Sequence, residues 1–377
     1  MGLKIVCSGY LVRHPVGGLS WHHFQYLLGL RRLGHEVTFF EDYGWCNSCY
    51  DPVQNLMTAD PTYGIAYLRT LFQPYGLAED WCYLAEDGTA YGMSRAQLAQ
   101  HCRECDVYFT LSNVNWIPEV EYCRRRVLVD TDPVFTQIDA HGFGKPFDWY
   151  DVRLTYGENV HQAGCSMPTG SARWLPTRQP VVLDVWPVEA GNPAASFTSV
   201  MNWTSIGEHE YQGQVYGEKP REFQQFLSFP QETGEPMELA IIAPEDVSAR
   251  LLQGGWRLAN ALEITRTPWT YQDYIKASRA EFAVARHGYV STQCGWFSDR
   301  STAYLAMGRP VVLQDTGFSA FLPCGAGLLA YHTKAEALAA IRHLATDYEA
   351  HCQAARAVAE EYFDARRVLS DMLEKSL

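Results

Sequence analysis

The sequence predicts two consecutive α/β domains, each built on a parallel sheet, and three observations support this. The chain has 377 residues, enough for two domains of ordinary size. An apolar run at 4–7 leads through a glycine-bearing loop and a helical pattern to a second apolar run at 36–40. A strand, helix and strand so close together is typical of a parallel βαβ unit. A similar alternation starts again near residue 196.

The elements of the first half follow from local patterns. Apolar side chains recur at helical spacing over 21–33, and Gly34 ends that helix. Further strands are expected at 107–111, 127–129 and 152–155, and a polar cluster follows each one. Because parallel sheets bind ligands at the carboxyl ends of their strands, these clusters are candidate site residues.

The second half repeats this architecture after a linker near 186–195. The predicted domains are therefore residues 1–190 and 191–354, with a C-terminal helix at about 355–377 that can pack back on the first domain. The expected strands lie at 196–201, 239–243, 262–264, 282–285, 310–313 and 327–330, and the expected helices at 219–228, 271–279, 299–307 and 334–346.

Composition limits the class of protein. Acidic residues outnumber basic ones 43 to 30, which gives a net charge of −13 and argues against a nucleic-acid partner. Hydrophobic residues make up 47% of the chain, which argues against disorder. We find no run of about 18 apolar residues and no signal-peptide pattern, so we expect no transmembrane segment and a cytoplasmic location.

The 11 cysteines include two pairs with the spacing of a zinc half-site. Cys46 and Cys49 form the first pair, and Cys102 and Cys105 form the second. The gap between the pairs is far longer than a zinc ribbon uses, so we expect packed thiols and no metal site.

The stretch 291–318 carries the most information about chemistry. It contains a glycine-bearing turn, a helix that opens with Ser298 or Asp299 as its N-cap, and then an apolar strand. The free N–H groups at such a helix start favour an anion such as a diphosphate, and Arg300 is placed to add donors. The alternative is an ordinary capped helix that binds nothing.

Several motifs resemble glycosyltransferases of the two-Rossmann, GT-B type. Residues 306–312 read Ala-Met-Gly-Arg-Pro-Val-Val, 315–317 read Asp-Thr-Gly and 325–329 read Gly-Ala-Gly-Leu-Leu, which is similar to the nucleotide-sugar domain of those enzymes. The glycines at 17–18 and the stretch 33–38 are similar to the opening of glycosyltransferase family 4. The resemblance implies two doubly wound Rossmann-like domains facing a central cleft. It also implies metal-independent transfer of a sugar from a UDP-, GDP- or dTDP-sugar to an unknown acceptor, without a further cofactor.

The sequence also departs from that pattern. Family 4 carries two glutamates eight positions apart where this chain has Gly295 and Ala303, and a third where it has Phe321. The chain therefore resembles a divergent relative of family 4, and its donor and stereochemistry do not follow from the resemblance. A nucleotide-sugar 2-epimerase on the same fold and a non-catalytic nucleotide- or sugar-binding protein remain alternatives.

Candidate site residues come from both domains. Lys219 stands where the family places a lysine that contacts the diphosphate. Asp132 follows a strand and is a candidate base, and the alternative is a turn or helix cap before Pro133, which an Asp-Pro pair favours. The expected donor-binding residues are Asn202, Lys219, Ser298, Arg300, Ser301, Thr302, Asp315, Thr316 and Gly317; the acceptor-binding residues are Gly17, Gly18 and Glu158; and the catalytic candidates are Asp132, His22 and His23, of which only one histidine is expected to face the cleft.

Overall fold

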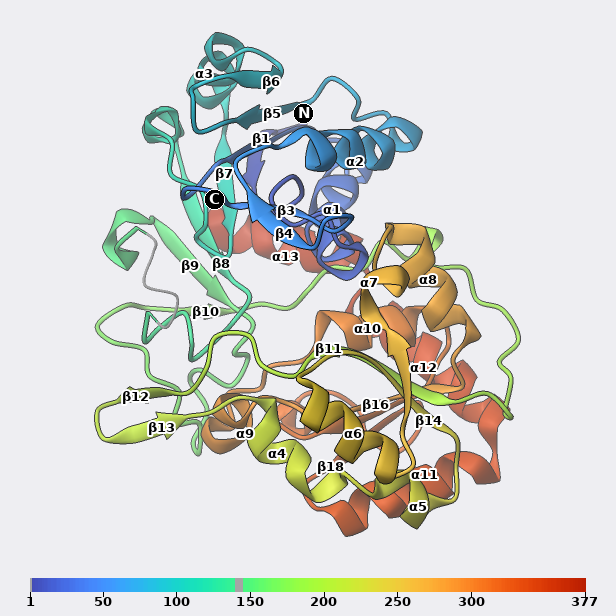
Figure 1. The fold of residues 1–377 in the computed structure, drawn as a ribbon. Helices are drawn as coiled ribbons and strands as arrows, with labels where there is room; N and C mark the ends of the chain where they lie inside the picture. Colours follow the sequence, from blue (N-terminus) through green and yellow to red (C-terminus); the bar gives the residue numbers. More distant parts are fainter. Residues whose placement is uncertain (1, 140–144) are drawn as a thin grey trace.

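The computed structural model describes residues 2–139 and 145–377 and shows two lobes, each with its own sheet (Figure 1). The upper lobe holds an eight-stranded sheet that is parallel except for its last strand. In spatial order its strands are β10 (Leu175–Pro176), β9 (Val152–Thr155), β8 (Arg126–Asp130), β7 (Val107–Leu111), β1 (Lys4–Ser8), β2 (Glu36–Asp42), β5 (Trp81–Leu84) and β6 (Ala90–Gly92).

The lower lobe holds a six-stranded sheet that is parallel throughout. Its spatial order is β15 (Arg257–Asn260), β14 (Met237–Ile242), β11 (Phe197–Asn202), β16 (Ala280–Ala283), β17 (Val311–Gln314) and β18 (Leu328–Tyr331). Leaving out β6 and β10, both sheets share the Rossmann order, which reverses beside the first strand of each lobe. The prediction of two Rossmann-like doubly wound units is confirmed.

Helices surround both sheets, and two short hairpins stand apart from them. The upper lobe has α1 (Gly17–Arg32), α2 (Thr62–Phe72) and α3 (Arg95–Glu104). The hairpins are β3 (Cys49–Asp51) with β4 (Leu56–Thr58), and β12 (His209–Tyr211) with β13 (Gln214–Tyr216). The lower lobe has α4 (Lys219–Phe223), α5 (Phe229–Thr233), α6 (Glu245–Gln253), α7 (Ala261–Ile264), α8 (Pro268–Ala277), α9 (His287–Thr292), α10 (Asp299–Ala306), α11 (Lys334–Thr346) and α12 (Tyr348–Tyr362).

The last helix, α13 (Ala365–Ser376), crosses back to the upper lobe and packs on α1 (Figure 1). The largest apolar core accordingly contains residues of both lobes. Within it, the rings of Trp21 and Trp186 lie 5.1 Å apart, and the Trp21 indole N–H donates to the carbonyl of Pro268. These contacts hold the lobes together along one side.

The start of α1 touches the lower lobe directly. The backbone N–H of Gly17 donates to the carbonyl oxygen of Thr265 over 2.7 Å. A Cβ atom at Gly17 would lie 2.4 Å from the carbonyl oxygen of Thr267, which is backbone and cannot move aside easily. The sequence therefore needs glycine here because the two lobes approach too closely for a side chain.

This contact predicts the effect of Gly17→Ala. The added methyl group should force the lobes apart and lower the free energy of unfolding by about 1–3 kcal/mol, measured by urea denaturation. Gly18→Ala is the matched control, because a Cβ atom there meets only the Tyr271 ring, at 3.3 Å. Equal stability of the two variants would contradict the tight contact.

Candidate active site

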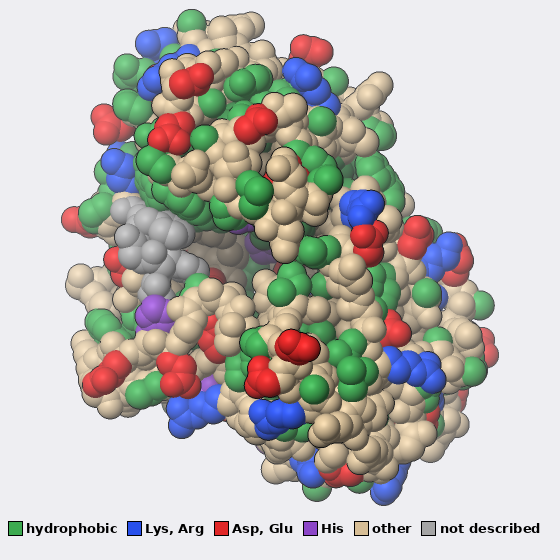
Figure 2. Space-filling model, in the orientation of Figure 1, with side chains coloured by type: hydrophobic (Ala, Val, Ile, Leu, Met, Phe, Trp, Pro, Cys, Tyr) green, Lys and Arg blue, Asp and Glu red, His purple; other side chains and the backbone are tan. Residues whose placement is uncertain are grey.

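A cleft of about 570 Å³ lies between the lobes, and both lobes line it (Figure 2 shows the furrow between them). It opens at the carboxyl ends of β11 and β14, beside the point where the strand order of the second sheet reverses. Ligands bind at this place in doubly wound sheets. Its lining residues include His14, Gly18, Leu19, Tyr50, Asn55, Met57, Asn202, Ser205, Lys219, Ile242, Ala261, Leu262, Arg286, Asp299 and Arg300.

Three cationic side chains converge on one end of the cleft. Arg286 follows β16, pairs with Asp132 of the upper lobe at 2.8 Å and donates to the Ser205 hydroxyl. Arg300 pairs with the buried Glu281 and donates to the carbonyl of Val200. The neighbouring Lys219 is in no ion pair with any described residue. Two of the cations are thus anchored by the protein, and the third is left for a ligand.

The electrostatics of Lys219 point the same way. Its pKa is lowered to about 7, first by burial and then by the charges of Arg300 and Arg286. The lysine is thus buried, and the two neighbouring guanidinium groups further disfavour its charged form. An anion bound beside these three side chains would relieve that repulsion.

The tip of α10 faces the cleft through Asp299, which was expected only as an alternative N-cap and not as a site residue. Asp299 is the one carboxylate among the described lining residues. Burial raises the pKa of Asp299, although the charge of Arg300 and the backbone N–H groups of Asp299 and Arg300 favour the charged form. The chain's own carboxylate therefore uses the helix-start donors that we assigned to a diphosphate.

The other expected residues of this helix do not line the cleft. Ser298 and Ser301 are buried, and the Ser301 hydroxyl has no hydrogen-bond partner among the described residues. Thr302 is also buried, and its hydroxyl donates to the carbonyl of Asp299. The cause is the packing of α10 between α8 and α12, which leaves only Asp299 and Arg300 facing the cavity.

The loop after β17 lies at a second contact between the lobes. Asp315, Thr316 and Gly317 are buried or enclosed there, and the Asp315 carboxylate accepts the Gly317 N–H. Asn159 of the upper lobe donates from its side chain to the carbonyl of Gly317 over 2.9 Å. This loop therefore lies outside the cleft lined by Asn202, Lys219 and Arg300, which the structure does bring together.

The upper-lobe candidates divide in the same way. Gly18 lines the cleft. Asp132 is not among its described lining residues, but it pairs with Arg286, which does line the cleft, and it accepts a hydrogen bond from Tyr289. Glu158 lies away from it, paired with Arg178 near α13, where burial raises its pKa to about 7. The assignment of Glu158 to the acceptor site therefore does not agree with its position.

Neither of the two candidate histidines lines the cleft. Burial lowers the pKa of His22 to about 4 and that of His23 to about 3, so both rings are neutral at pH 7. The His22 Nδ1 atom lies 3.8 Å from the Asp299 carboxylate. His14, which follows the buried Arg13, lines the cleft in their place.

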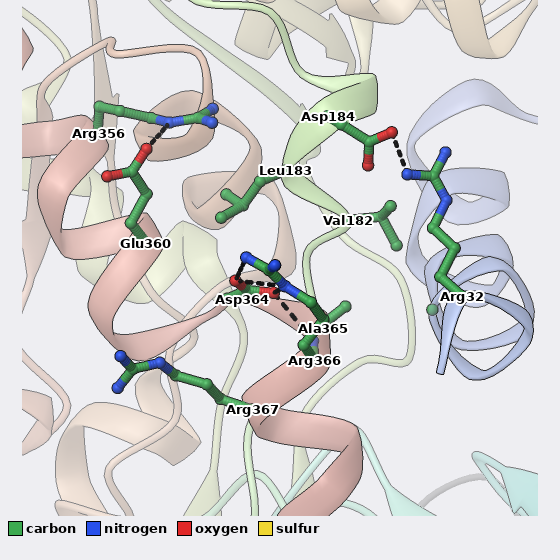
Figure 3. Close-up of a pocket in the computed structure, with 11 residues that line it drawn as sticks. Arg32, Val182, Leu183, Asp184, Arg356, Glu360, Asp364, Ala365, Arg366 and Arg367 are labelled. Atoms are coloured by element: carbon green, nitrogen blue, oxygen red, sulfur yellow. Dashed lines mark hydrogen bonds and ion pairs between the residues drawn. The ribbon is translucent and has the colours of Figure 1, made fainter. Parts of the chain in front are cut away.

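A larger cavity of about 720 Å³ lies beside α1, α12 and α13 and is lined by four arginines (Figure 3). Each arginine is paired with an acidic side chain. The pairs are Arg32 with Asp184, Arg356 with Glu360, Arg366 with Asp364, and Arg367 with Glu361. Because these charges are compensated within the protein, this cavity offers an anion less than the cleft does.

The paired cysteines contribute no metal centre in the described residues, where no group of three or more ligands is arranged to hold a metal ion. Cys102 and Cys105 are buried, and the Cys46 thiol donates to Glu86.

No helix in the described part of the chain has the length and apolarity to cross a membrane.

Comparison with known proteins supports the fold. No family model and no curated protein matches the sequence. Among solved structures, AviGT4, a glycosyltransferase involved in avilamycin A biosynthesis, is 13% identical with a TM-score of 0.57, over 99% of this chain and 96% of that one. An alpha-glucosyltransferase in complex with UDP-glucose and DNA is 10% identical with a TM-score of 0.60, over 98% of each chain. Alr3699/HepE of Anabaena, in complex with UDP and glucose, is 11% identical with a TM-score of 0.56, over 99% of this chain and 98% of that one. The chain therefore has the GT-B fold found in these glycosyltransferases.

Proposed function

We propose that the protein is a glycosyltransferase that binds a nucleoside-diphosphate sugar in the cleft. The observation that carries this proposal is the division of the cleft into a cationic end and an uncharged end. Arg286 follows β16 and Arg300 bonds to Val200 of β11, with Lys219 beside them, whereas Ile242 ends β14 and Leu262 follows β15 on the other side of the sheet. A nucleotide has the matching division, because its diphosphate is anionic and its base is flat and uncharged. The UDP-bound structural neighbours support the same assignment.

The leaving diphosphate would be neutralised by these cations, which supply charge that other transferases take from a metal ion. We infer that Asp299 accepts the proton of the acceptor hydroxyl. The oxygen of that hydroxyl then bonds to the anomeric carbon of the sugar, and the bond from this carbon to the diphosphate breaks. Membership of family 4, independence of metal and a cytoplasmic location are parts of this proposal. The acceptor is left open, since nothing in the cleft identifies it.

A thermal-shift panel tests the proposal directly. UDP, GDP, dTDP and their sugars are each added to the purified protein, and at least one should raise the melting temperature. Release of nucleoside diphosphate from the sugar that binds then separates a transferase from a binding protein. If no nucleotide of the panel stabilises the protein, the proposed function is wrong.

The lowered pKa of Lys219 predicts a pH dependence of binding. Without ligand, this lysine loses its proton as the pH rises through about 7, whereas a bound diphosphate restores the charged form. Binding above pH 7 must therefore take up a proton, and the association constant should fall by up to about tenfold per pH unit. Titration calorimetry between pH 7 and 9 measures this. Lys219→Arg should abolish the fall, because arginine stays charged; a fall of equal size in that variant would contradict the assignment to Lys219.

A further inference from the structure

The hairpin of β3 and β4 is an appendage of the upper lobe that reaches the cleft. Tyr50 and Met57 are directly opposed across its two strands, so their side chains share one face, and both line the cleft. The turn is held by Asp51, whose carboxylate accepts the N–H groups of Val53 and Gln54. Neither sheet of the lobes includes this hairpin.

The root of the hairpin is fixed rigidly to the upper lobe. The Tyr50 N–H donates to the carbonyl of Arg13 over 2.8 Å. Arg13 is fully buried and pairs with Glu41, which also accepts the backbone N–H groups of Leu11, Val12 and Arg13. The backbone of Tyr50 is thus bonded to a buried residue of the upper lobe that is itself held by an ion pair.

The opposite wall of the cleft belongs to the lower lobe and is also uncharged. It is formed by Ile242 at the end of β14 and by Ala261 and Leu262 of α7. Met57 and Ile242 remain 44% and 50% exposed, so both walls present apolar surface to the cleft. Two apolar walls that face each other across an open cleft are suited to a flat, uncharged ring.

We propose that Tyr50 and Met57 form the upper-lobe wall of the nucleobase site, so that the nucleotide is held by both lobes. This inference rests on the proposed function and adds a specificity-determining element to it. The occupant is the base rather than the acceptor because the walls share one cavity with the diphosphate-binding cations. The Tyr50 hydroxyl donates to the side-chain oxygen of Asn55, which leaves the Asn55 amino group to donate to a carbonyl of the base.

The test compares ligands with and without a base. UDP, GDP and dTDP, together with inorganic pyrophosphate, are titrated into the wild type, Tyr50→Ala and Met57→Ala by calorimetry. Each variant should bind the preferred nucleoside diphosphate about tenfold more weakly. Pyrophosphate affinity should stay the same, because the cations are untouched. Met57→Leu should keep the affinity, because the apolar volume is retained.

Val53→Ala is the matched control, since Val53 lies on the same hairpin, is 78% exposed and does not line the cleft. It should leave all affinities unchanged. Nucleotide binding that is equal in the wild type and both alanine variants would overturn the role of the hairpin while leaving the proposed function intact. Equal weakening of pyrophosphate would also overturn it, because the hairpin would then act through general disruption. If no nucleotide binds the wild type, both proposals fail.

Discussion

Lys219→Met is expected to weaken nucleoside-diphosphate binding by about 100-fold, which corresponds to roughly 2.7 kcal/mol. The substitution keeps the apolar stem but removes the one cation of the cleft that has no ion-pair partner among the described residues. Arg286 and Arg300 would remain, held by Asp132 and Glu281. Titration calorimetry with UDP, GDP and dTDP at pH 7 measures the effect.

The control for this prediction is Lys4→Met, which removes an exposed lysine that pairs with Glu104 on the surface. That variant should bind nucleotides as the wild type does. Loss of affinity in both variants would indicate a general effect of net charge. A change of less than twofold in Lys219→Met would show that the diphosphate does not lie beside Lys219.

Asp299→Asn is expected to lower the rate of sugar transfer by about 100-fold or more while changing nucleotide affinity little. Asparagine has nearly the same shape but cannot accept a proton. His22 is not expected to replace the carboxylate, because it does not line the cleft. Release of nucleoside diphosphate from the nucleotide sugar that binds measures the rate, with water or an added alcohol as the acceptor.

Asp246→Asn is a matched control for the helix position, because Asp246 is an exposed carboxylate in the first turn of α6. It should retain full activity. If Asp299→Asn is as active as this control, Asp299 is not the base. The base would then be sought at His14, which is the histidine that lines the cleft.

Much of the fold could be predicted from short patterns. The strands at 107–111 and 152–155 have the expected bounds. The first is buried along its whole length and is a nearly continuous apolar run, which is typical of parallel strands covered on both faces. The strand expected at 262–264 is wrong. Residues Ala261–Ile264 form α7, capped by the Asn260 side chain, and the strand before it, Arg257–Asn260, is an edge strand with polar ends. Such a strand carries too weak an apolar signal to be found.

The site could be predicted only where a residue directly follows a strand or starts a helix. Asn202, Lys219 and Arg300 meet that condition and line the cleft. Arg286 also follows a strand, β16, so its position in the sequence could have marked it as a site residue. The hairpin residue Met57 gave no such signal, because its place in the cleft depends on how the lobes pack. Long-range packing also buries Ser301.

A crystal structure with bound UDP would test this account most directly. We expect the diphosphate within about 3 Å of the Lys219 ammonium and next to Arg286, and the uracil ring between Met57 and Leu262. UDP in the arginine-lined cavity beside α13, with the cleft empty, would contradict the assignment of the cleft and the function inferred from it.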